Sequence, residues 1–255
     1  MVQQRRSVLS DAQVADFGAC GFLRFPAFAD ATICAEMMTR VVEIVRLHAA
    51  GASTGPAIVL PEANLAGRSA RPEQLVSKVF KLHRDSVFAA FAAAGQVTDI
   101  VADLVGPTLD CFLSQFIFKN PGAWGQPWHQ DSFYFPFEPP RPIVGVWLAV
   151  TAATLDNGCL HVLPGSNREP IHDHVPDRRP GANYGYVEIT DHDMSGAVPV
   201  LMEPGDLLVF DSHLMHRSTD NLSDGIRAAM VFHYAASGTV ERVPGLVNDF
   251  VPVRP

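Results

Sequence analysis

The chain has 255 residues, 27 acidic and 19 basic side chains, and a formal net charge of −8 at pH 7. No basic stripe suited to nucleic acid is present, and no apolar run reaches the roughly 18 residues that span a membrane. Near the N-terminus, Arg5 and Arg6 are not followed by the apolar core of a secretory signal. We therefore expect no nucleic-acid or membrane partner, while the oligomeric state cannot be inferred from the sequence.

The cysteines lie far apart and lack the C-x-x-C spacing of many metal and redox sites. We expect them to be reduced and buried, which favours a cytoplasmic location. They are Cys20, Cys34, Cys111 and Cys159.

Residues 1–108 are predicted to form a mainly helical N-terminal layer. Residues 11–48 and 85–105 carry apolar side chains near helical spacing, with Asp30 as a candidate helix cap. Residues 49–75, rich in Gly and Pro, are predicted to be loop. The apolar positions expected after Asp30 are Ile33, Met37, Val41, Ile44 and Val45.

From residue 109 the pattern changes to short strands separated by Gly and Pro turns. Residues 109–119 alternate, with Phe112, Phe116 and Phe118 expected on one face. Further strands are predicted at 144–150, 159–163, 207–210 and 228–234. Many short strands behind a helical layer are typical of a jelly roll. The fold class is therefore α+β, mainly β with N-terminal helices, in a single domain (1–255) whose jelly-roll core spans residues 109–236.

A candidate metal site is formed by His129, Asp131 and a distant histidine. In a strand, His129 and Asp131 point to the same side while Gln130 points away. Two imidazoles and one carboxylate bind one face of a non-haem Fe(II) and leave the other face open for a co-substrate and O₂. The residues alone leave His213 and His216 as alternatives for the third ligand, and an ordinary buried His–Asp pair is the simpler interpretation of the motif.

Arg227 lies eleven residues after His216, within an apolar run over residues 226–235. A planar guanidinium binds a carboxylate through two hydrogen bonds. A buried arginine beside such a metal is therefore a suitable partner for the far carboxylate of 2-oxoglutarate.

Three separated stretches resemble the phytanoyl-CoA dioxygenase family. They run from Trp128 to Phe137, from Asp156 to Ser166, and from Pro204 to Phe210 followed by His216, Arg217 and Ser218. The resemblance covers roughly residues 78–236. It implies a double-stranded β-helix of the cupin-like type, with Fe(II), 2-oxoglutarate and O₂ as cofactor and co-substrates. The reaction implied is oxidative decarboxylation of 2-oxoglutarate to succinate and CO₂, coupled to hydroxylation of a small molecule.

The resemblance also implies roles for single residues. In the family a Ser and an Arg follow the distal histidine at +2 and +11, and Ser218 and Arg227 meet both offsets from His216 rather than His213. The implied metal ligands are thus His129, Asp131 and His216, with Arg227 as the catalytic clamp. The implied co-substrate contacts are Arg227, Ser218, Trp147 and Lys78, with Lys81 as an alternative to Lys78.

Other residues are expected to face the same cavity. Phe116 or Ile117, together with Gln115, should flank the co-substrate, and Tyr134 and His161 are candidates for contact with substrate. For Gln115 and Tyr134 the alternative is ordinary packing, and for His161 it is a place in the core.

The retained carboxylate of Asp131 favours hydroxylation, or a related desaturation or ring closure, over halogenation, because halogenases of this superfamily have a small residue there. Alternative functions are a cupin-like metal-dependent isomerase or hydrolase, an acyl-CoA hydroxylase of the same family, or a non-catalytic metal-binding domain. An isomerase does not need the clamp of Arg227. No basic cluster suggests a grip on CoA phosphates, so a metabolite or natural product is favoured as substrate.

Residues 165–198 interrupt the strands with a segment rich in Pro, Gly, Asp and His. Loops of this length inside a compact domain are usually lids, binding loops or mobile surface segments. We interpret this one as a lid-like insertion, because it starts at the edge of the candidate site. His172, His174 and His192 lie in it at a spacing that matches no ordinary metal site.

Overall fold

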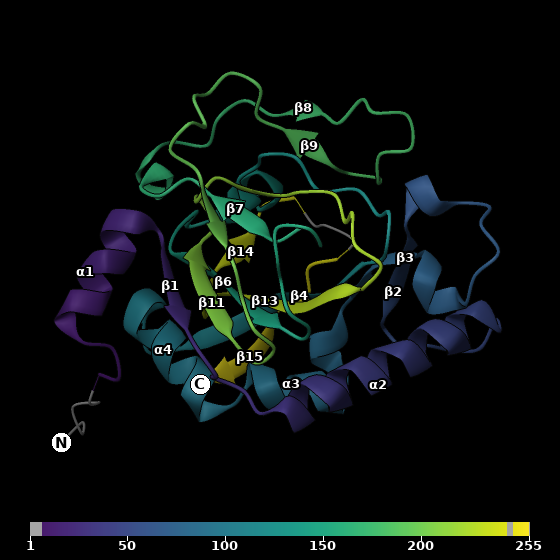
Figure 1. The fold of residues 1–255 in the computed structure, drawn as a ribbon. Helices are drawn as coiled ribbons and strands as arrows, with labels where there is room; N and C mark the ends of the chain where they lie inside the picture. Colours follow the sequence, from purple (N-terminus) through teal and green to yellow (C-terminus); the bar gives the residue numbers. More distant parts are fainter. Residues whose placement is uncertain (1–6, 244–246, 255) are drawn as a thin grey trace.

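The computed structural model describes residues 7–243 and 247–254, so Arg5 and Arg6 lie outside the described residues. A large antiparallel sheet with the strand order β1-β11-β6-β13-β4-β3-β2 forms the centre of the molecule, and β15 pairs with β4 beside it (Figure 1). Its strands are β1 (Phe22–Phe25), β2 (Ile58–Pro61), β3 (Val76–Phe80), β4 (Leu109–Lys119), β6 (Ile143–Ala149), β11 (Leu207–Asp211), β13 (Arg227–Ala236) and β15 (Val251–Arg254).

A smaller antiparallel sheet with the order β10-β7-β12 faces the large one. Its strands are β10 (Val198–Val200), β7 (Leu160–Val162) and β12 (His216–Ser218). Buried side chains from both sheets, including Trp147, Val162 and Leu208, form a shared core cluster. Two packed antiparallel sheets confirm the predicted jelly roll. Two short pairs complete the strands, β5 (Phe137–Glu138) with β14 (Val240–Glu241) and β8 (Val175–Pro176) with β9 (Val187–Glu188).

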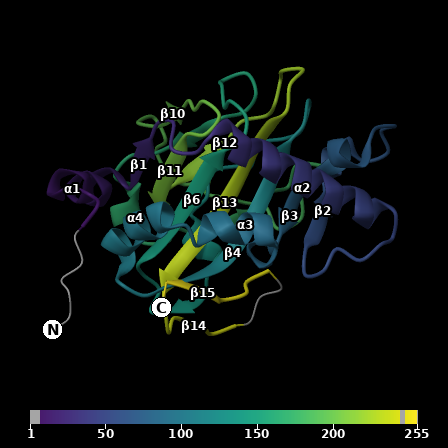
Figure 2. The same cartoon turned by 90° about the horizontal axis from the view of Figure 1, so that it is seen from below.

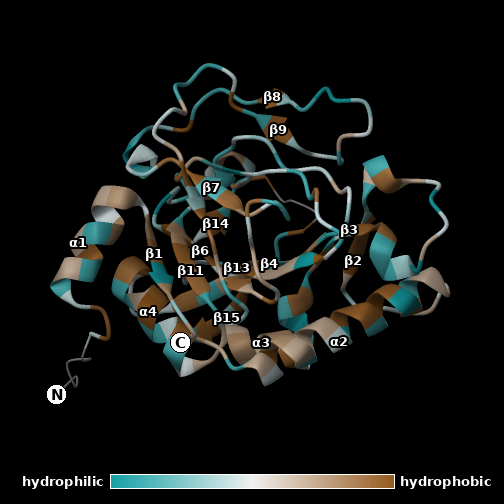
Figure 3. Cartoon of the chain, viewed as in Figure 1, coloured by the Kyte–Doolittle hydropathy of each residue, from teal (hydrophilic) through white to brown (hydrophobic). Residues whose placement is uncertain are grey.

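Helices cover the other face of the large sheet. Figures 1 and 2 show α2 (Ala31–Ala49), α3 (Ser86–Ala92) and α4 (Gly95–Val105) lying across it, with α1 (Asp11–Cys20) at one end. The buried faces of α2 and α3 place Met37, Val41 and Phe91 in one core cluster with Phe116 and Phe232 of the sheet. In Figure 3 the strands and the inner helix faces are apolar, whereas the segment carrying β8 and β9 is mostly polar.

The helical prediction was wrong between α1 and α2 and again near residue 93. Gly21 ends α1 with a φ of 87°, and the next residues form β1, in which Phe22 pairs with Phe210 of β11. Asp30 is the N-cap residue of α2 but makes no side-chain capping hydrogen bond. The region predicted as loop contains β2, which pairs with β3 at the sheet edge. Tertiary pairing therefore overrides local composition at both places.

The prediction that Phe112, Phe116 and Phe118 share one face was also wrong. The register between β4 and β13 shifts so that Cys111 pairs with Tyr234 and Leu113 with His233, which leaves Phe112 as the extra residue of a bulge. Phe112 consequently packs with Phe135 and Phe137 on the cavity side, away from Phe116 and Phe118.

In the described part of the chain, no single helix is long and apolar enough to cross a membrane, although the bent pair Ser86–Ala92 and Gly95–Val105 meets that test by length and composition alone. All four cysteines are free.

Truncation of a buried side chain on α2 should destabilise the protein far more than truncation of an exposed one. Met37 is 1% exposed and Leu47, on the same helix, is 40% exposed. We expect Met37→Ala to lower the free energy of unfolding by about 2–5 kcal/mol, because it removes buried apolar atoms and leaves a cavity. Leu47→Ala should change it by no more than about 0.5 kcal/mol. Urea denaturation measures both, and equal losses would contradict the packing described here.

Candidate metal centre and co-substrate site

A backbone bridge brings the two candidate histidine ligands together. The amide of His129 donates to the carbonyl of His216 at 3.0 Å, and the amide of His216 donates back at 3.0 Å. Asp131 begins a short 3-10 turn, Asp131–Tyr134, so the prediction that it lies in a strand was wrong. The side chains nevertheless converge, with Asp131 Oδ1 3.4 Å from His129 Nε2 and 3.8 Å from His216 Nε2. The three ligand atoms lie within 4.8 Å of one another.

Hydrogen bonds present the Nε2 atom of each histidine to the centre of this group. The Nδ1 atom of His129 donates to the carbonyl of Pro127 at 2.8 Å, and that of His216 donates to the carbonyl of Leu214 at 2.9 Å. With the proton on Nδ1, each Nε2 carries the free lone pair that a metal needs. The amide of Gln126 lies 3.0 Å from His129 Nε2, which fits Nε2 as the acceptor. Burial also lowers the pKa of His216 to about 4, so this ring is neutral at pH 7.

Asp131 is held as an anion by its neighbours. Burial alone would raise its pKa, but the nearby imidazoles of His216, His129 and His233 outweigh burial and hold the pKa well below the usual range. The second carboxylate oxygen, Oδ2, lies 2.7 Å from His233 Nε2. His233 is a buried residue of β13 that sequence reasoning missed. Its offset of six residues from Arg227 on one strand, an even number, was the available signal that both share a face.

Gln130 points away from the candidate ligands, as the sequence predicted. Its Nε2 donates to the carbonyls of Pro170 and His213, and its Oε1 accepts from the amide of His172. The side chain between His129 and Asp131 is therefore fixed to the long segment that follows β7.

Arg227 ends in the same cavity with unsatisfied donors. It is 1% exposed, and within residues 7–243 and 247–254 its one hydrogen bond runs from Nη2 to the carbonyl of Gly158 at 3.1 Å. Nε and Nη1 of Arg227 and the indole Nε1 of Trp147 are buried without a hydrogen-bond partner among the described residues. Burial lowers the pKa of Arg227 to about 10, which leaves it charged at pH 7. A buried cation with free donors fits a carboxylate ligand.

Lys119 is a second buried cation that the sequence reading overlooked. It pairs with Arg227 in the register of β4 and β13. Its Nζ donates to Ser218 Oγ at 2.8 Å and to the carbonyl of Thr219 at 2.6 Å. Burial lowers its pKa, and the nearby charge of Arg227 lowers it further, but its three acceptors, Ser218 Oγ and the carbonyls of Thr219 and Trp124, match the three N–H donors of the ammonium form. Alternation along residues 109–119 places Lys119 on the face of Gln115 and Ile117, and this signal was available in the sequence.

A cavity of about 660 Å³ joins these groups. Besides the three ligand candidates and Arg227, it is lined by six of the side chains expected there, Lys78, Gln115, Ile117, Tyr134, Trp147 and Ser218. Lys78 Nζ donates to Gln126 Oε1 at 3.0 Å. Lys81, the alternative to Lys78, is not among the lining residues and lies in the left-handed backbone region with a φ of 61°.

Two of the residues expected in this cavity, Phe116 and His161, do not line it. Phe116 packs against Phe118 in the core between the sheet and the helices and does not line the cavity, whereas Ile117 does. His161 is not a lining residue either, because its neighbour Leu160 faces the cavity and successive strand residues face opposite sides.

One wall of the cavity is polar and comes from the long segment and the β2 region. Asn183 Nδ2 donates to Glu62 Oε1 at 2.8 Å and to Ser77 Oγ at 3.1 Å. Burial raises the pKa of Glu62. Tyr134 donates to the carbonyl of Gly185 at 3.0 Å, and residues 182–186 all line the cavity. Loop composition gave no signal for these contacts.

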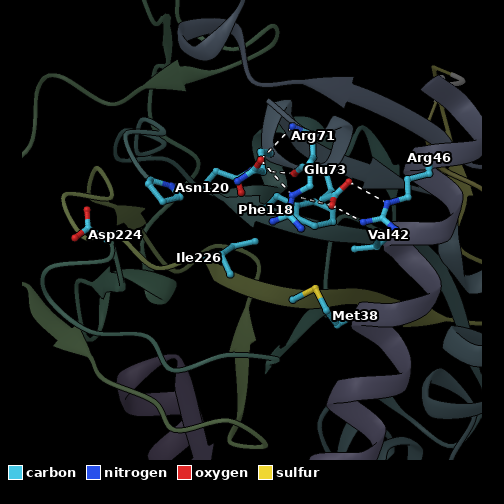
Figure 4. Close-up of a pocket in the computed structure, with 11 residues that line it drawn as sticks. Met38, Val42, Arg46, Arg71, Glu73, Phe118, Asn120, Asp224 and Ile226 are labelled. Carbon is cyan, nitrogen blue, oxygen red and sulfur yellow. Dashed lines mark hydrogen bonds and ion pairs between the residues drawn. The ribbon is translucent and has the colours of Figure 1, made fainter. Parts of the chain in front are cut away.

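A second cavity of about 410 Å³ lies between α2 and the end of β4 (Figure 4). Glu73 pairs there with Arg46 at 2.7 Å and lies 3.6 Å from Arg71. Asn120 Nδ2 donates to the carbonyls of Glu73 and Val76. Three charged residues of this cavity, Arg46, Arg71 and Glu73, thus lie in ion pairs with one another, and Asp224 also lines it.

The fold and the donor set define the class: a double-stranded β-helix that brings two histidines and one carboxylate together in one cavity. The model of the phytanoyl-CoA dioxygenase (PhyH) family matches residues 17–229, and the chain belongs to this family.

Curated relatives and solved structures agree with this assignment. The peroxisomal phytanoyl-CoA dioxygenase of Bos taurus is 34% identical over 169 residues, which cover 64% of this chain and 50% of the relative. The chain thus matches about half the length of that relative. Phytanoyl-CoA dioxygenase domain-containing protein 1 of Bos taurus is 29% identical over 91% of this chain and 92% of its own length.

Two solved structures share the fold. EctD from S. alaskensis with bound Fe has a TM-score of 0.73 at 21% identity, covering 94% of this chain and 82% of that one. The epimerase SnoN, in complex with Fe3+, alpha ketoglutarate and nogalamycin RO, has a TM-score of 0.69 at 19% identity, covering 91% and 86%.

Removal of the hydrogen bond from His233 should weaken metal binding without removing a ligand. We expect His233→Leu to lower the affinity for Fe(II) about 10–100-fold, the usual loss when a residue that orients a metal ligand is removed. Leucine suits a position surrounded by the rings of Phe112, Phe135 and Phe210. The matched control is His161→Leu, outside the cavity. Anaerobic Fe(II) titration measures both, and equal affinities in the two variants would contradict the role of His233.

Proposed function

We propose that this protein is a non-haem Fe(II)- and 2-oxoglutarate-dependent dioxygenase that oxidises a small molecule. The observation that carries the proposal is the pair of unsatisfied donors on buried Arg227, in one cavity with His129, Asp131 and His216. A cupin-like isomerase or hydrolase that needs only a metal has no use for this cation. Family membership supports the same activity.

The residues have separate tasks in this proposal. His129, Asp131 and His216 hold Fe(II) on one face. Arg227 binds the far carboxylate of 2-oxoglutarate, and Lys119 and Ser218 add positive charge and a hydroxyl beside it. Fe(II) and 2-oxoglutarate held by these residues would supply O₂ activation, with decarboxylation to succinate and CO₂ coupled to oxidation of a substrate C–H bond. Because Asp131 keeps its carboxylate, we propose hydroxylation, desaturation or ring closure rather than halogenation.

Turnover of 2-oxoglutarate tests the proposal directly. With Fe(II), ascorbate and ¹⁸O₂, the wild type should form succinate carrying one labelled oxygen, fastest with the true substrate in a metabolite panel and slowly without it. Asp131→Ala should reduce this rate to background, because it removes the anionic ligand. Succinate formation no faster in the wild type than in Asp131→Ala, across the panel, would refute the proposed activity.

Replacement of the arginine clamp should weaken co-substrate binding while metal binding remains. Arg227→Lys keeps a charge but loses the two-pronged contact, which should cost about 1.5–3 kcal/mol, roughly a ten- to hundred-fold loss in affinity for 2-oxoglutarate. Arg217→Lys is the control, because Arg217 lies over the ring of Trp128 and outside the cavity. Calorimetry on the metal-loaded variants measures the affinity. Unchanged binding in Arg227→Lys would remove this residue from the role.

The cavity favours a compact, largely apolar substrate. Its walls include the apolar side chains of Ile58, Leu60, Phe80 and Leu113, and the ionisable residues Glu62 and Lys78 line it too. The structural neighbours solved with 5-hydroxyectoine and with nogalamycin RO bind small metabolites. An acyl-CoA, suggested by the names of the sequence relatives, is the alternative. Comparing free metabolites with acyl-CoA thioesters in the succinate assay decides between them.

We also propose a cytoplasmic location, supported by the free state of all four cysteines. Fractionation of cells that express the tagged protein tests this, and recovery with membranes or in an oxidising compartment would contradict it.

Residues 165–198 are proposed to act as a lid. Residues 182–186 line the cavity, and the segment is attached to the rim by Arg179 Nη2, which donates to the carbonyl of Gly125 at 2.8 Å. Opening must break this bond and those of Asn183 before substrate can enter. Amide hydrogen exchange of the segment should therefore slow when 2-oxoglutarate and substrate are both bound. Identical exchange in the free and bound states would leave the segment as an inert loop.

A further inference from the structure

A second group of metal-ligating side chains lies outside the iron site. Glu169, His172 and His192 place their ligand atoms within 4.8 Å of one another. Glu169 Oε2 is 2.8 Å from His172 Nε2 and 3.0 Å from His192 Nε2. The two imidazole rings are nearly perpendicular, at 88°, with centroids 5.0 Å apart. Both rings therefore direct a nitrogen at the same carboxylate oxygen.

The three residues come from the two ends of the long segment. Glu169 and His172 follow η5 (Ser166–Arg168), where the segment leaves the small sheet, and His192 lies shortly before β10, where it returns. The side chains are sheltered, with exposed fractions of 38% for Glu169, 25% for His172 and 19% for His192. A cation at this place would tie the outgoing chain to the returning chain at the base of the segment.

The backbone around the cluster is already ordered by other contacts. The amide of His172 donates to Gln130 Oε1 at 2.8 Å, and the carbonyl of Glu169 accepts from His213 Nδ1 at 3.2 Å. His192 Nδ1 donates to the carbonyl of Asp193 at 3.0 Å, and its Nε2, 3.0 Å from Glu169 Oε2, donates to that carboxylate in the metal-free cluster. A bound metal would displace this Nε2 proton. These contacts reduce the conformational entropy that a bound ion would have to remove.

His174, the third histidine of the segment, is engaged elsewhere. Its Nε2 accepts from the amide of Gln130 at 3.0 Å, and its ring stacks on Phe133 with centroids 4.3 Å apart. The sequence reading grouped the three histidines and found no ordinary spacing. In the structure, the third member of the cluster is Glu169, three residues before His172, and not His174. The cluster therefore offers two nitrogens and one oxygen.

We propose that Glu169, His172 and His192 form a second metal site, suited to Zn(II). A metal bound there would connect the two ends of the 165–198 segment, and we call this site the clip. Imidazole nitrogen and carboxylate oxygen suit zinc, with water as the fourth ligand. Zinc ligands at bond lengths of about 2.0–2.2 Å lie about 3.3–3.6 Å apart in a tetrahedron. The observed separations of 2.8 and 3.0 Å are those of the metal-free cluster, and they would need to open by about 0.3–0.8 Å to reach that spacing.

The site would act on the iron centre through Gln130. His172 holds Gln130 Oε1, and the Gln130 Nε2 donates to the carbonyl of Pro170 in the same turn. Gln130 stands between His129 and Asp131 in the chain. Zinc bound at the clip would therefore stiffen both the segment over the cavity and the turn that carries two candidate iron ligands. The metal site itself does not depend on the proposed dioxygenase activity.

Zinc stoichiometry of the full chain tests the proposal. After removal of metals with a chelator, Zn(II) titration should give two equivalents per chain in the wild type. His129→Ala/His216→Ala should retain the clip equivalent and lose the other. Glu169→Gln/His192→Asn should lose the clip equivalent and keep the other. His174→Asn, a neighbouring histidine outside the cluster, should still bind two.

Amide hydrogen exchange provides a second test, which compares each variant with and without Zn(II) and so does not depend on the folding of a single variant. In His129→Ala/His216→Ala, Zn(II) should slow amide exchange in residues 165–198, and the further change Glu169→Gln should abolish this effect. One equivalent in the wild type that disappears in His129→Ala/His216→Ala would mean that the cluster is only a hydrogen-bonded carboxylate, and would overturn the proposal. Two equivalents retained in Glu169→Gln/His192→Asn would overturn it equally.

Discussion

The backbone pairing of residues 126–129 with β12 is the constraint on which the site depends. The reciprocal amide bonds of His129 and His216, at 3.0 Å each, put two ring nitrogens side by side. Two residues further on, the amide of Ser218 donates to the carbonyl of Gln126 at 3.0 Å. This close approach requires Gly125, because a Cβ there would lie 2.0 Å from the carbonyl oxygen of Ser218. One short ladder thus places both histidine ligands and Ser218 along the cavity.

The remaining polar groups are separated by charge along the length of β13. On β13, His233 contacts Asp131 while Arg227, six residues earlier, is paired in register with Lys119 of β4. The anion therefore lies among imidazoles, which suits a divalent cation, and the two cations lie together where a carboxylate would be attracted. Burial sharpens both preferences, because unpaired charges are costly away from water.

Sequence reasoning identified the residues whose chemistry follows from type and spacing. His129, Asp131, His216 and Arg227 converge as expected, and β4 has the predicted bounds. It failed where tertiary contacts decide. The bulge at Phe112 turns this side chain to the opposite face of the sheet from Phe116 and Phe118. Residues Phe22–Phe25 form a strand because they pair with the edge of β11. Glu169 was missed because its partner His192 lies twenty-three residues later in the sequence, and only the folded loop brings the two side chains together.

The central claim is that one cavity holds Fe(II) and 2-oxoglutarate together. When a 2-oxo acid chelates Fe(II), electron transfer from the metal to the ligand gives a weak visible absorption that neither component shows alone. Under anaerobic conditions, the wild type with one equivalent of Fe(II) and excess 2-oxoglutarate should develop this band, and succinate in place of 2-oxoglutarate should not produce it. Absence of the band in the folded, iron-loaded wild type, or an unchanged band in His129→Ala/His216→Ala, would contradict the account.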